Sequence, residues 1–186
     1  DTTQLDDSIE PSLKQTAEKA RARLDSGEVA DEEQAEQDRD LWSRLRNGFA
    51  MDHDQGDERV QQQLDWYARH PAYIGRVVER GRRYLHYIIE ETERRGLPME
   101  YALLPVVESA FDPFAYSHGR ASGLWQFIPG TGRHFGLDQS WWHDDRRDVI
   151  ASTNAALTYL DQLAKRFDGD PTLALAAYNS GGGTVN

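Results

Sequence analysis

One stretch of the chain places a single carboxylate among apolar residues. Residues 101–111 read YALLPVVESAF, in which Glu108 is the only charged residue. If the stretch is helical, its neighbours on the same face are all apolar or aromatic. Such surroundings disfavour the ionised carboxylate and raise its pKa, which suits a general acid near neutral pH. The alternative is an ordinary helical glutamate that reaches water or an arginine. The neighbours in question are Tyr101, Leu104, Pro105 and Phe111.

Aromatic residues are concentrated around and after Glu108. Nine of the 42 residues in 101–142 are aromatic, about twice the 10% average of the chain. Large rings can stack on the apolar faces of sugars or bases, and they can equally seal the loops of a helical core. Both interpretations stay open. The nine are Tyr101, Phe111, Phe114, Tyr116, Trp125, Phe127, Phe135, Trp141 and Trp142.

Two further motifs carry polar groups in apolar settings. Within ASGLWQF, Gln126 offers an amide between bulky residues, and glycines at 119 and 123 would let the backbone approach a ligand. Tyr178-Asn179 ends an apolar helical segment just before three glycines, where a binding cleft or an ordinary helix cap would both fit. Each motif alone is a weak signal.

Several site types are excluded or lack support. The chain has no cysteine, no His-Glu-x-x-His and no glycine-rich nucleotide loop, so we expect neither a metal nor a cofactor. Ser109 has no evident His partner for a serine triad. A two-carboxylate glycosidase would need a second acid, for which nothing in the pattern selects among the candidates. These candidates are Asp112, Asp144 and Asp145.

Charge is distributed unevenly over the 186 residues. Residues 1–60 hold 17 Asp/Glu against 8 Lys/Arg, whereas the remainder is nearly balanced within a net charge of −11. No basic cluster suggests nucleic acid, and no apolar run reaches the length of a membrane span. No signal segment opens the chain, so Asp1 is expected to be a mature or trimmed start.

Three- and four-residue apolar periodicity without strand-like alternation predicts an all-α fold. We expect an acidic, partly helical segment over residues 1–56, with a thin apolar stripe of Leu13, Ala17, Ala20 and Leu24, and a helical domain over 57–186. In the longest helix, Gly96 is placed to end it and Pro98 to start the next. The helices are predicted at 57–69, 73–95, 101–111, 129–135, 146–167 and 172–179.

Three motifs together resemble the goose-type-lysozyme-like lytic transglycosylases of bacterial peptidoglycan. They are Glu108-Ser109 in LLPVVESAF, residues 123–126 in ASGLWQF, and residues 177–181 in LALAAYNSGGG. The resemblance covers roughly residues 88–186 and extends more weakly upstream. It implies a lysozyme-like helical catalytic domain with an N-terminal helical extension, acting in the bacterial cell envelope or periplasm.

The resemblance implies cleavage of the β-1,4 bond between N-acetylmuramic acid and N-acetylglucosamine without water. Glu108 would protonate the glycosidic oxygen and then, as base, help close a 1,6-anhydro ring. By motif, Ser117 and Gln126 would contact N-acetyl and sugar groups, while Tyr178 and Asn179 would position the acid and line the cleft. Glycan contacts are also expected from Tyr116, Trp125 and Phe127.

The resemblance also sets expectations about the ends of the chain. The family domain continues past the Ala-Tyr-Asn motif with further helices, so a C-terminally truncated domain is expected here. A lipid-anchor signal and C-terminal glycan-binding repeats are absent from these residues. The alternatives to a transglycosylase are a lysozyme-type hydrolase and a non-catalytic peptidoglycan-binding fragment. In the binding-fragment alternative the acidic segment is a candidate for partner recruitment, and a separate possibility is that this segment inhibits an active enzyme. Protein partners are unknown.

Overall fold

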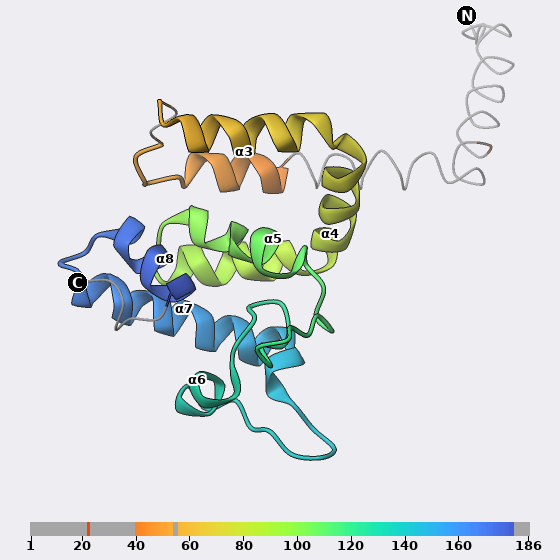
Figure 1. Ribbon diagram of the computed structural model, residues 1–186, viewed down its shortest axis with the longest axis vertical. Coiled ribbons are helices and arrows are strands. Elements are labelled where there is room, and N and C mark those ends of the chain that lie inside the picture. The colour runs from red at the N-terminus through yellow and green to blue at the C-terminus, as the bar shows by residue number, and fades with distance from the viewer. Residues whose placement is uncertain (1–21, 23–39, 54–55, 181–186) are drawn as a thin grey trace, which may run out of the picture. The chain divides into compact units, whose positions relative to one another are not determined.

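A computed structural model describes residue 22 and residues 40–53 and 56–180 (Figure 1). In this part of the chain every named element is a helix, and the only strand-like pairings are isolated bridges. The predicted all-α class is therefore confirmed. No helix among these residues is long and apolar enough to cross a bilayer. The elements are α3 (Glu58–Arg69), α4 (Pro71–Arg94), η1 (Met99–Leu103), α5 (Leu104–Ser109), α6 (Pro129–His134), η2 (Asp145–Arg147), α7 (Val149–Arg166) and α8 (Pro171–Ser180).

Helix α4 is the longest element and forms one side of the core. Pro71 occupies its first turn, where the missing N–H costs nothing, so the helix starts two residues earlier than predicted. Gly96, with φ of +64°, ends it as predicted. The Leu97 N–H donates to the Thr92 carbonyl and the Gly96 N–H to the Glu93 carbonyl, a Schellman-type closure. The buried face carries Val77, Gly81, Leu85, Ile88, Ile89 and Thr92.

Helix α7 packs against α4 and supplies the other side of the core. Its inward face is made of small and branched residues, with Leu157 and Leu160 fully buried. Polar groups join the two helices at their edge, because the Arg95 guanidinium donates to the Asn154 side chain at 2.6 Å and the Thr158 hydroxyl at 2.9 Å. The Asn154 amide in turn donates to the Tyr87 hydroxyl. Helix α8 follows α7 and packs on it.

The single helix predicted over residues 101–111 is corrected to two pieces. Residues 99–103 form the 3-10 turn η1, and α5 begins at Leu104 with Pro105 in its first turn. The helix then ends early, since Ala110 and Phe111 both adopt left-handed backbone, with φ of 52° and 56°. Such a conformation costs a residue with a β-carbon about 1 kcal/mol. Phe111 therefore lies beyond the end of α5, and its predicted place on the helical face of Glu108 is wrong.

Packing of Phe111 on α4 accompanies this left-handed bend. Its ring is almost completely buried and lies against Gly81, where a β-carbon would stand 3.0 Å from the ring carbons. The Phe111 N–H also donates to the Pro105 carbonyl at 3.1 Å, which closes the end of α5. The small residue on α4 thus makes room for the side chain that follows the catalytic candidate.

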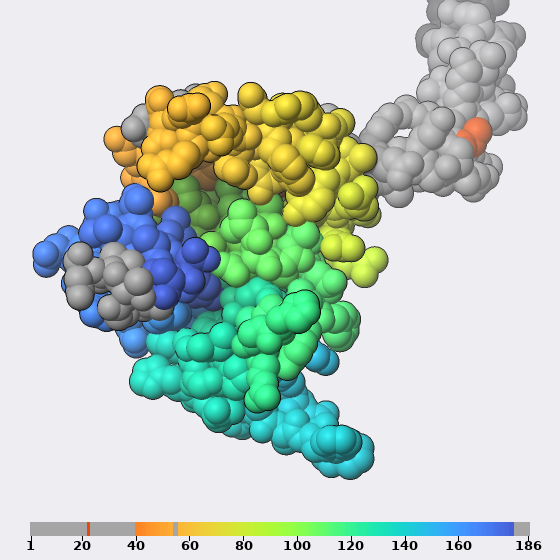
Figure 2. All heavy atoms as spheres, in the orientation of Figure 1, coloured from red at the N-terminus to blue at the C-terminus, as the bar shows by residue number. Residues whose placement is uncertain are grey.

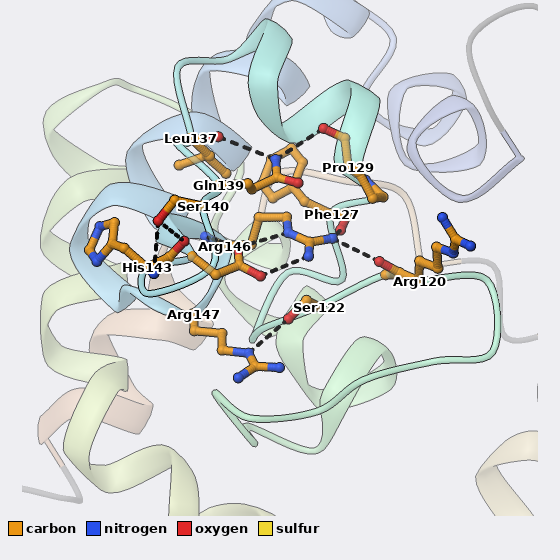
Figure 3. A network of polar contacts seen from close by, with 12 residues as sticks. Arg120, Ser122, Phe127, Pro129, Leu137, Gln139, Ser140, His143, Arg146 and Arg147 are labelled. Atoms are coloured by element: carbon orange, nitrogen blue, oxygen red, sulfur yellow. Dashed lines mark hydrogen bonds and ion pairs between the residues drawn. The ribbon is translucent and has the colours of Figure 1, made fainter.

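The loop between α5 and α6 is held by a buried arginine (Figure 3). Arg146 is only 6% exposed, and its guanidinium forms two hydrogen bonds with Asp144, at 2.9 and 2.7 Å. Its remaining terminal nitrogen donates to the carbonyls of Arg120 at 2.7 Å and Phe127 at 3.0 Å. The ion pair holds the pKa of the Asp144 carboxyl below its usual range. A buried charge is tolerated when it is paired and fully hydrogen-bonded in this way.

The N-terminal predictions are only partly within the described residues. The stripe Leu13, Ala17, Ala20 and Leu24 lies outside them. The chain divides into two compact units after Trp42, and residues 43–53 belong to the same unit as the helices above. In that unit the backbone N–H groups of Ala50 and Met51 donate to the Glu100 carboxylate. The functional division predicted between 1–56 and 57–186 stays a prediction.

A substitution at Gly123 tests how tightly the loop is packed against η2. Its φ is +84°, and a β-carbon there would lie 1.7 Å from the Arg146 carbonyl oxygen. We expect Gly123→Ala to lower the free energy of unfolding by about 3 kcal/mol. The alanine would adopt a strained left-handed conformation, and the backbone at Arg146 would also have to move away from its β-carbon. Gly96→Ala is the matched control: its φ is +64° but the space around it is open, so about 1 kcal/mol is expected. Urea denaturation measures both, and equal losses would contradict the packing argument.

Candidate active site

The end of α5 presents Glu108 to a cavity of about 460 Å³. The end of α5 is tied to the following loop, because the Ser109 hydroxyl donates a hydrogen bond to the Leu124 carbonyl at 2.9 Å. Figure 2 shows the green surface of α5 and the following loop beside the blue surface of α8. These elements, with α6 and α7, form the walls. The lining residues are Glu108, Ser117, Ala121, Gln126, Phe127, Ile128, Thr131, Tyr159, Tyr178, Asn179 and Ser180.

Glu108 is the only carboxylate among the described residues that line this cavity. Its side chain is half-buried and forms no hydrogen bond or ion pair with any described residue. Burial raises the pKa of its carboxyl above the usual value near 4.5. The direction of this pKa shift agrees with the prediction, and its cause is burial of the Glu108 side chain. A carboxyl group so placed can both give and accept a proton.

Tyr178 comes from α8 and joins the helix to the loop. Its hydroxyl donates to the Trp125 carbonyl at 2.8 Å. Burial raises the pKa of Tyr178 well above 10, and the nearby Glu108 carboxylate adds to the shift. Its ring contacts those of Phe127, at 6.2 Å between centroids, and Tyr159, at 5.3 Å. The Tyr178 side chain is therefore neutral, is held in place by its hydrogen bond, and lines the cavity beside Glu108.

Gln126 and Ser117 bring polar atoms from the loop to the cavity. Gln126 has φ of 47°, and its side-chain N–H groups donate to the carbonyls of Gly123 at 2.8 Å and Ala115 at 3.3 Å. Its side-chain oxygen has no partner among the described residues, which leaves an acceptor for a ligand N–H or O–H. The Ser117 hydroxyl accepts from the Ala121 N–H at 3.1 Å and keeps its proton available to donate.

The structure thus brings six of the eight predicted site residues to one cavity. Phe127 lines it with little exposed surface, and Asn179 lines it as an exposed side chain. Trp125 is a correction: its ring is completely buried and its indole N–H donates to the Thr153 hydroxyl at 3.0 Å, so it is a core residue and not a glycan contact. Tyr116 is 59% exposed but does not line the cavity, and its role stays a prediction.

None of the three candidate second carboxylates lines the cavity. Asp144 is engaged by Arg146, as described above. Asp145 accepts from the Asp138 N–H at 2.9 Å and contacts His143, and Asp112 accepts from the Phe114 N–H at 2.9 Å. Each of these acids stabilises a turn. A mechanism that uses two carboxylates is therefore not supported by the described residues.

Sequence reasoning missed several wall residues. Tyr159 contributes from the inward side of α7, and Thr131 and Ile128 from the start of α6. The sequence does contain a signal for Tyr159, a large polar ring next to the buried Leu160. No comparable signal marks Thr131 or Ile128, whose positions depend on how α6 folds over the loop. Among the described residues no cluster of three His, Cys, Asp or Glu could hold a metal.

Comparison with known proteins agrees with this geometry. The family model for the transglycosylase SLT domain matches residues 86–186, more than half of the chain, and the chain belongs to this family. Membrane-bound lytic murein transglycosylase D of Escherichia coli is 47% identical over 148 residues, which are 80% of this chain and 32% of that protein. Membrane-bound lytic murein transglycosylase C of Glaesserella parasuis is 33% identical over 132 residues, covering 64% of this chain and 36% of the relative.

A solved structure is also similar. It is that of an inactive mutant of the lytic transglycosylase Slt from Pseudomonas aeruginosa, with 26% identity and a TM-score of 0.48, covering 89% of this chain and 28% of that one. The chain spans about a third of the length of the curated relatives described above.

Glu108 should reduce stability where it is ionised. Because its folded-state pKa is raised, the folded protein holds the proton more tightly than the unfolded chain, so stability falls as pH rises from about 4.5 through the folded pKa. Glu108→Gln removes this loss. We expect the variant to melt at a higher temperature than the parent at pH 8 and at nearly the same temperature at pH 4. A melting difference that does not depend on pH would contradict this account.

Tyr178→Phe should separate the hydroxyl from the ring. The change leaves the Trp125 carbonyl without its donor, which we expect to lower the free energy of unfolding by about 1 kcal/mol. Tyr159→Phe is the control, since the Tyr159 hydroxyl has no hydrogen-bond partner among the described residues. Urea denaturation compares the two, and a loss for Tyr159→Phe as large as that for Tyr178→Phe would refute the assignment.

Proposed function

We propose that the protein is a peptidoglycan lytic transglycosylase. It cleaves the β-1,4 bond between N-acetylmuramic acid and N-acetylglucosamine and forms 1,6-anhydromuramoyl ends. The observation that carries the proposal is that Glu108 is the one carboxylate among the described residues that line the cavity, because hydrolytic glycosidases ordinarily use two. Family membership supports the same chemistry. The names of the relatives, membrane-bound murein transglycosylases, support a place of action in the bacterial cell envelope, and we propose the periplasm.

In the proposed mechanism Glu108 acts twice. Its carboxyl proton passes to the glycosidic oxygen as the bond from that oxygen to muramoyl C1 breaks. The resulting carboxylate then takes the proton of the muramoyl C6 hydroxyl, whose oxygen attacks C1 and closes the 1,6-anhydro ring. Glu108 ends protonated, and no water is consumed. The raised pKa of Glu108 serves the first step, and the absence of a partner among the described residues leaves its carboxylate available for the second.

The remaining cavity residues orient the glycan in this proposal. Ser117 offers a hydroxyl donor and Gln126 a side-chain acceptor, which together match an N-acetyl group with its carbonyl and N–H. Tyr178 fixes the wall beside Glu108 through its bond to the Trp125 carbonyl. Asn179 is the next residue in α8, is exposed and lines the cavity, and in this proposal it contacts the glycan strand.

Digestion of purified sacculi tests the reaction. We expect 1,6-anhydromuropeptides by mass spectrometry, and we expect Glu108→Gln to lower their rate of release by about a thousandfold while helical circular dichroism is unchanged. Asp112→Asn is the matched control, because this neighbouring acid lies outside the cavity and should leave the rate within about twofold.

The products distinguish the alternatives. Reducing ends in place of anhydro ends would assign the protein to lysozyme-type hydrolases. Saturable binding to sacculi that survives Glu108→Gln, with no product from the parent protein at high concentration, would instead indicate a peptidoglycan-binding module.

A further inference from the structure

A second hollow of about 430 Å³ adjoins the catalytic cavity. The two share Thr131 of α6 and Tyr159 of α7 as lining residues, so the second hollow lies directly beside the catalytic cavity. The floor is apolar, from Phe135 and the buried Leu163. The polar side chains of the hollow are Thr131, His134, Tyr159, Gln162 and Arg166.

One face of α7 leads from the catalytic cavity to the far end of this hollow. Tyr159, Gln162 and Arg166 follow at three- and four-residue steps, so their side chains share a face. The seven residue steps from Tyr159 to Arg166 cover about 10 Å along the helix axis. Arg166 therefore lies about two turns along α7 from Tyr159, which also lines the catalytic cavity.

Charge makes the hollow unusual within this chain. The whole protein holds 32 acidic against 21 basic residues, yet among the described residues no carboxylate lines the hollow and Arg166 does. Among the described residues Arg166 has no hydrogen-bond or ion-pair partner, and its guanidinium lies over the Phe167 ring at 5.6 Å. The adjacent Lys165, in contrast, pairs with Asp161 at 2.6 Å. Arg166 is thus a positive charge available to a ligand.

The chemistry of the donors selects the ligand group. A guanidinium binds a planar carboxylate through two parallel hydrogen bonds. The Gln162 amide, the Thr131 hydroxyl and the His134 imidazole add donors and acceptors suited to peptide groups. The apolar floor accepts methyl and methylene groups. The combination matches a short peptide with a free carboxylate better than it matches another sugar ring.

We infer that this hollow binds a carboxylate-bearing peptide branch of the glycan strand, with Arg166 as its anchoring cation. The inference rests on the proposed function, because it requires a peptidoglycan strand in the catalytic cavity. It makes Arg166 a specificity residue: it contacts the branch of the substrate and takes no part in bond cleavage. Strands that carry peptides are therefore bound more tightly than strands without them.

The test compares two substrates: glycan strands with their peptides, and the same strands after the peptides have been removed enzymatically. The measured quantity is the ratio of kcat/KM for the two. We expect the parent to prefer peptide-bearing strands and Arg166→Gln to lower this preference about fivefold, mainly through KM. Added salt should lower the preference of the parent more than that of the variant.

Lys165→Gln is the matched control, since it removes a neighbouring positive charge that does not line the hollow. The control should keep the preference of the parent. An equal loss in both variants would reduce the effect to general electrostatics, and an unchanged preference in Arg166→Gln would overturn the inference.

A binding measurement separates this inference from the proposed function. Titration calorimetry with Glu108→Gln protein measures the dissociation constants of both strand types without turnover, before and after Arg166→Gln is added. If the parent releases no anhydro product, the proposed function fails while the calorimetry still decides the role of Arg166. If anhydro product forms but neither turnover nor binding distinguishes the two strands, the inference fails and the proposed function stands.

Discussion

The buried guanidinium of Arg146 is the interaction on which the cavity depends. The loop from Asp112 to Ile128 is held by isolated bridges and turn hydrogen bonds and has no regular ladder, so some of its carbonyls take donors from elsewhere. Arg146 supplies them at Arg120 and Phe127 while Asp144 neutralises its charge. The loop provides one wall of the cavity. The Arg146–Asp144 ion pair, which does not itself line the cavity, therefore helps to fix the position of the loop residues that do. Removing either partner would leave an uncompensated charge in the interior, which is the costly way to break such a pair.

The parts of the fold that were predictable are those governed by local periodicity. Helices α4 and α7 bury residues at three- and four-residue intervals, and Gly96 ends α4 by a rule that needs only its missing side chain. The left-handed end of α5 was not predictable in this way, because it accompanies the packing of Phe111 on a distant glycine. Trp125 shows the same limit. Its neighbours in sequence are loop residues, but its burial depends on Thr153, which is 28 positions away.

The candidate site was predictable to a different degree. The position of Glu108 followed from residue types alone, and the motifs placed Gln126 and Tyr178 beside it. The supporting residues are ordinary in sequence: Arg146 is one of many arginines in the chain, and nothing local indicates that it is buried. The three acids near the site serve turns through local contacts, with partners two to seven residues away, and among the described residues Glu108 is the one carboxylate that lines the cavity. Residue types and motifs therefore predicted which groups gather at the cavity, and long-range packing decided the buried contacts that support them.

The contact between Phe111 and Gly81 links a helix remote from the cavity to the geometry of the acid. Phe111 lies three residues after Glu108. The left-handed backbone at Ala110 and Phe111 accompanies the packing of the Phe111 ring on Gly81 of α4. A larger residue at position 81 would push the ring out and let α5 run on, turning the carboxyl toward another direction. Position 81 is therefore restricted by the packing that accompanies the end of α5 beside Glu108, although it lies outside the cavity wall.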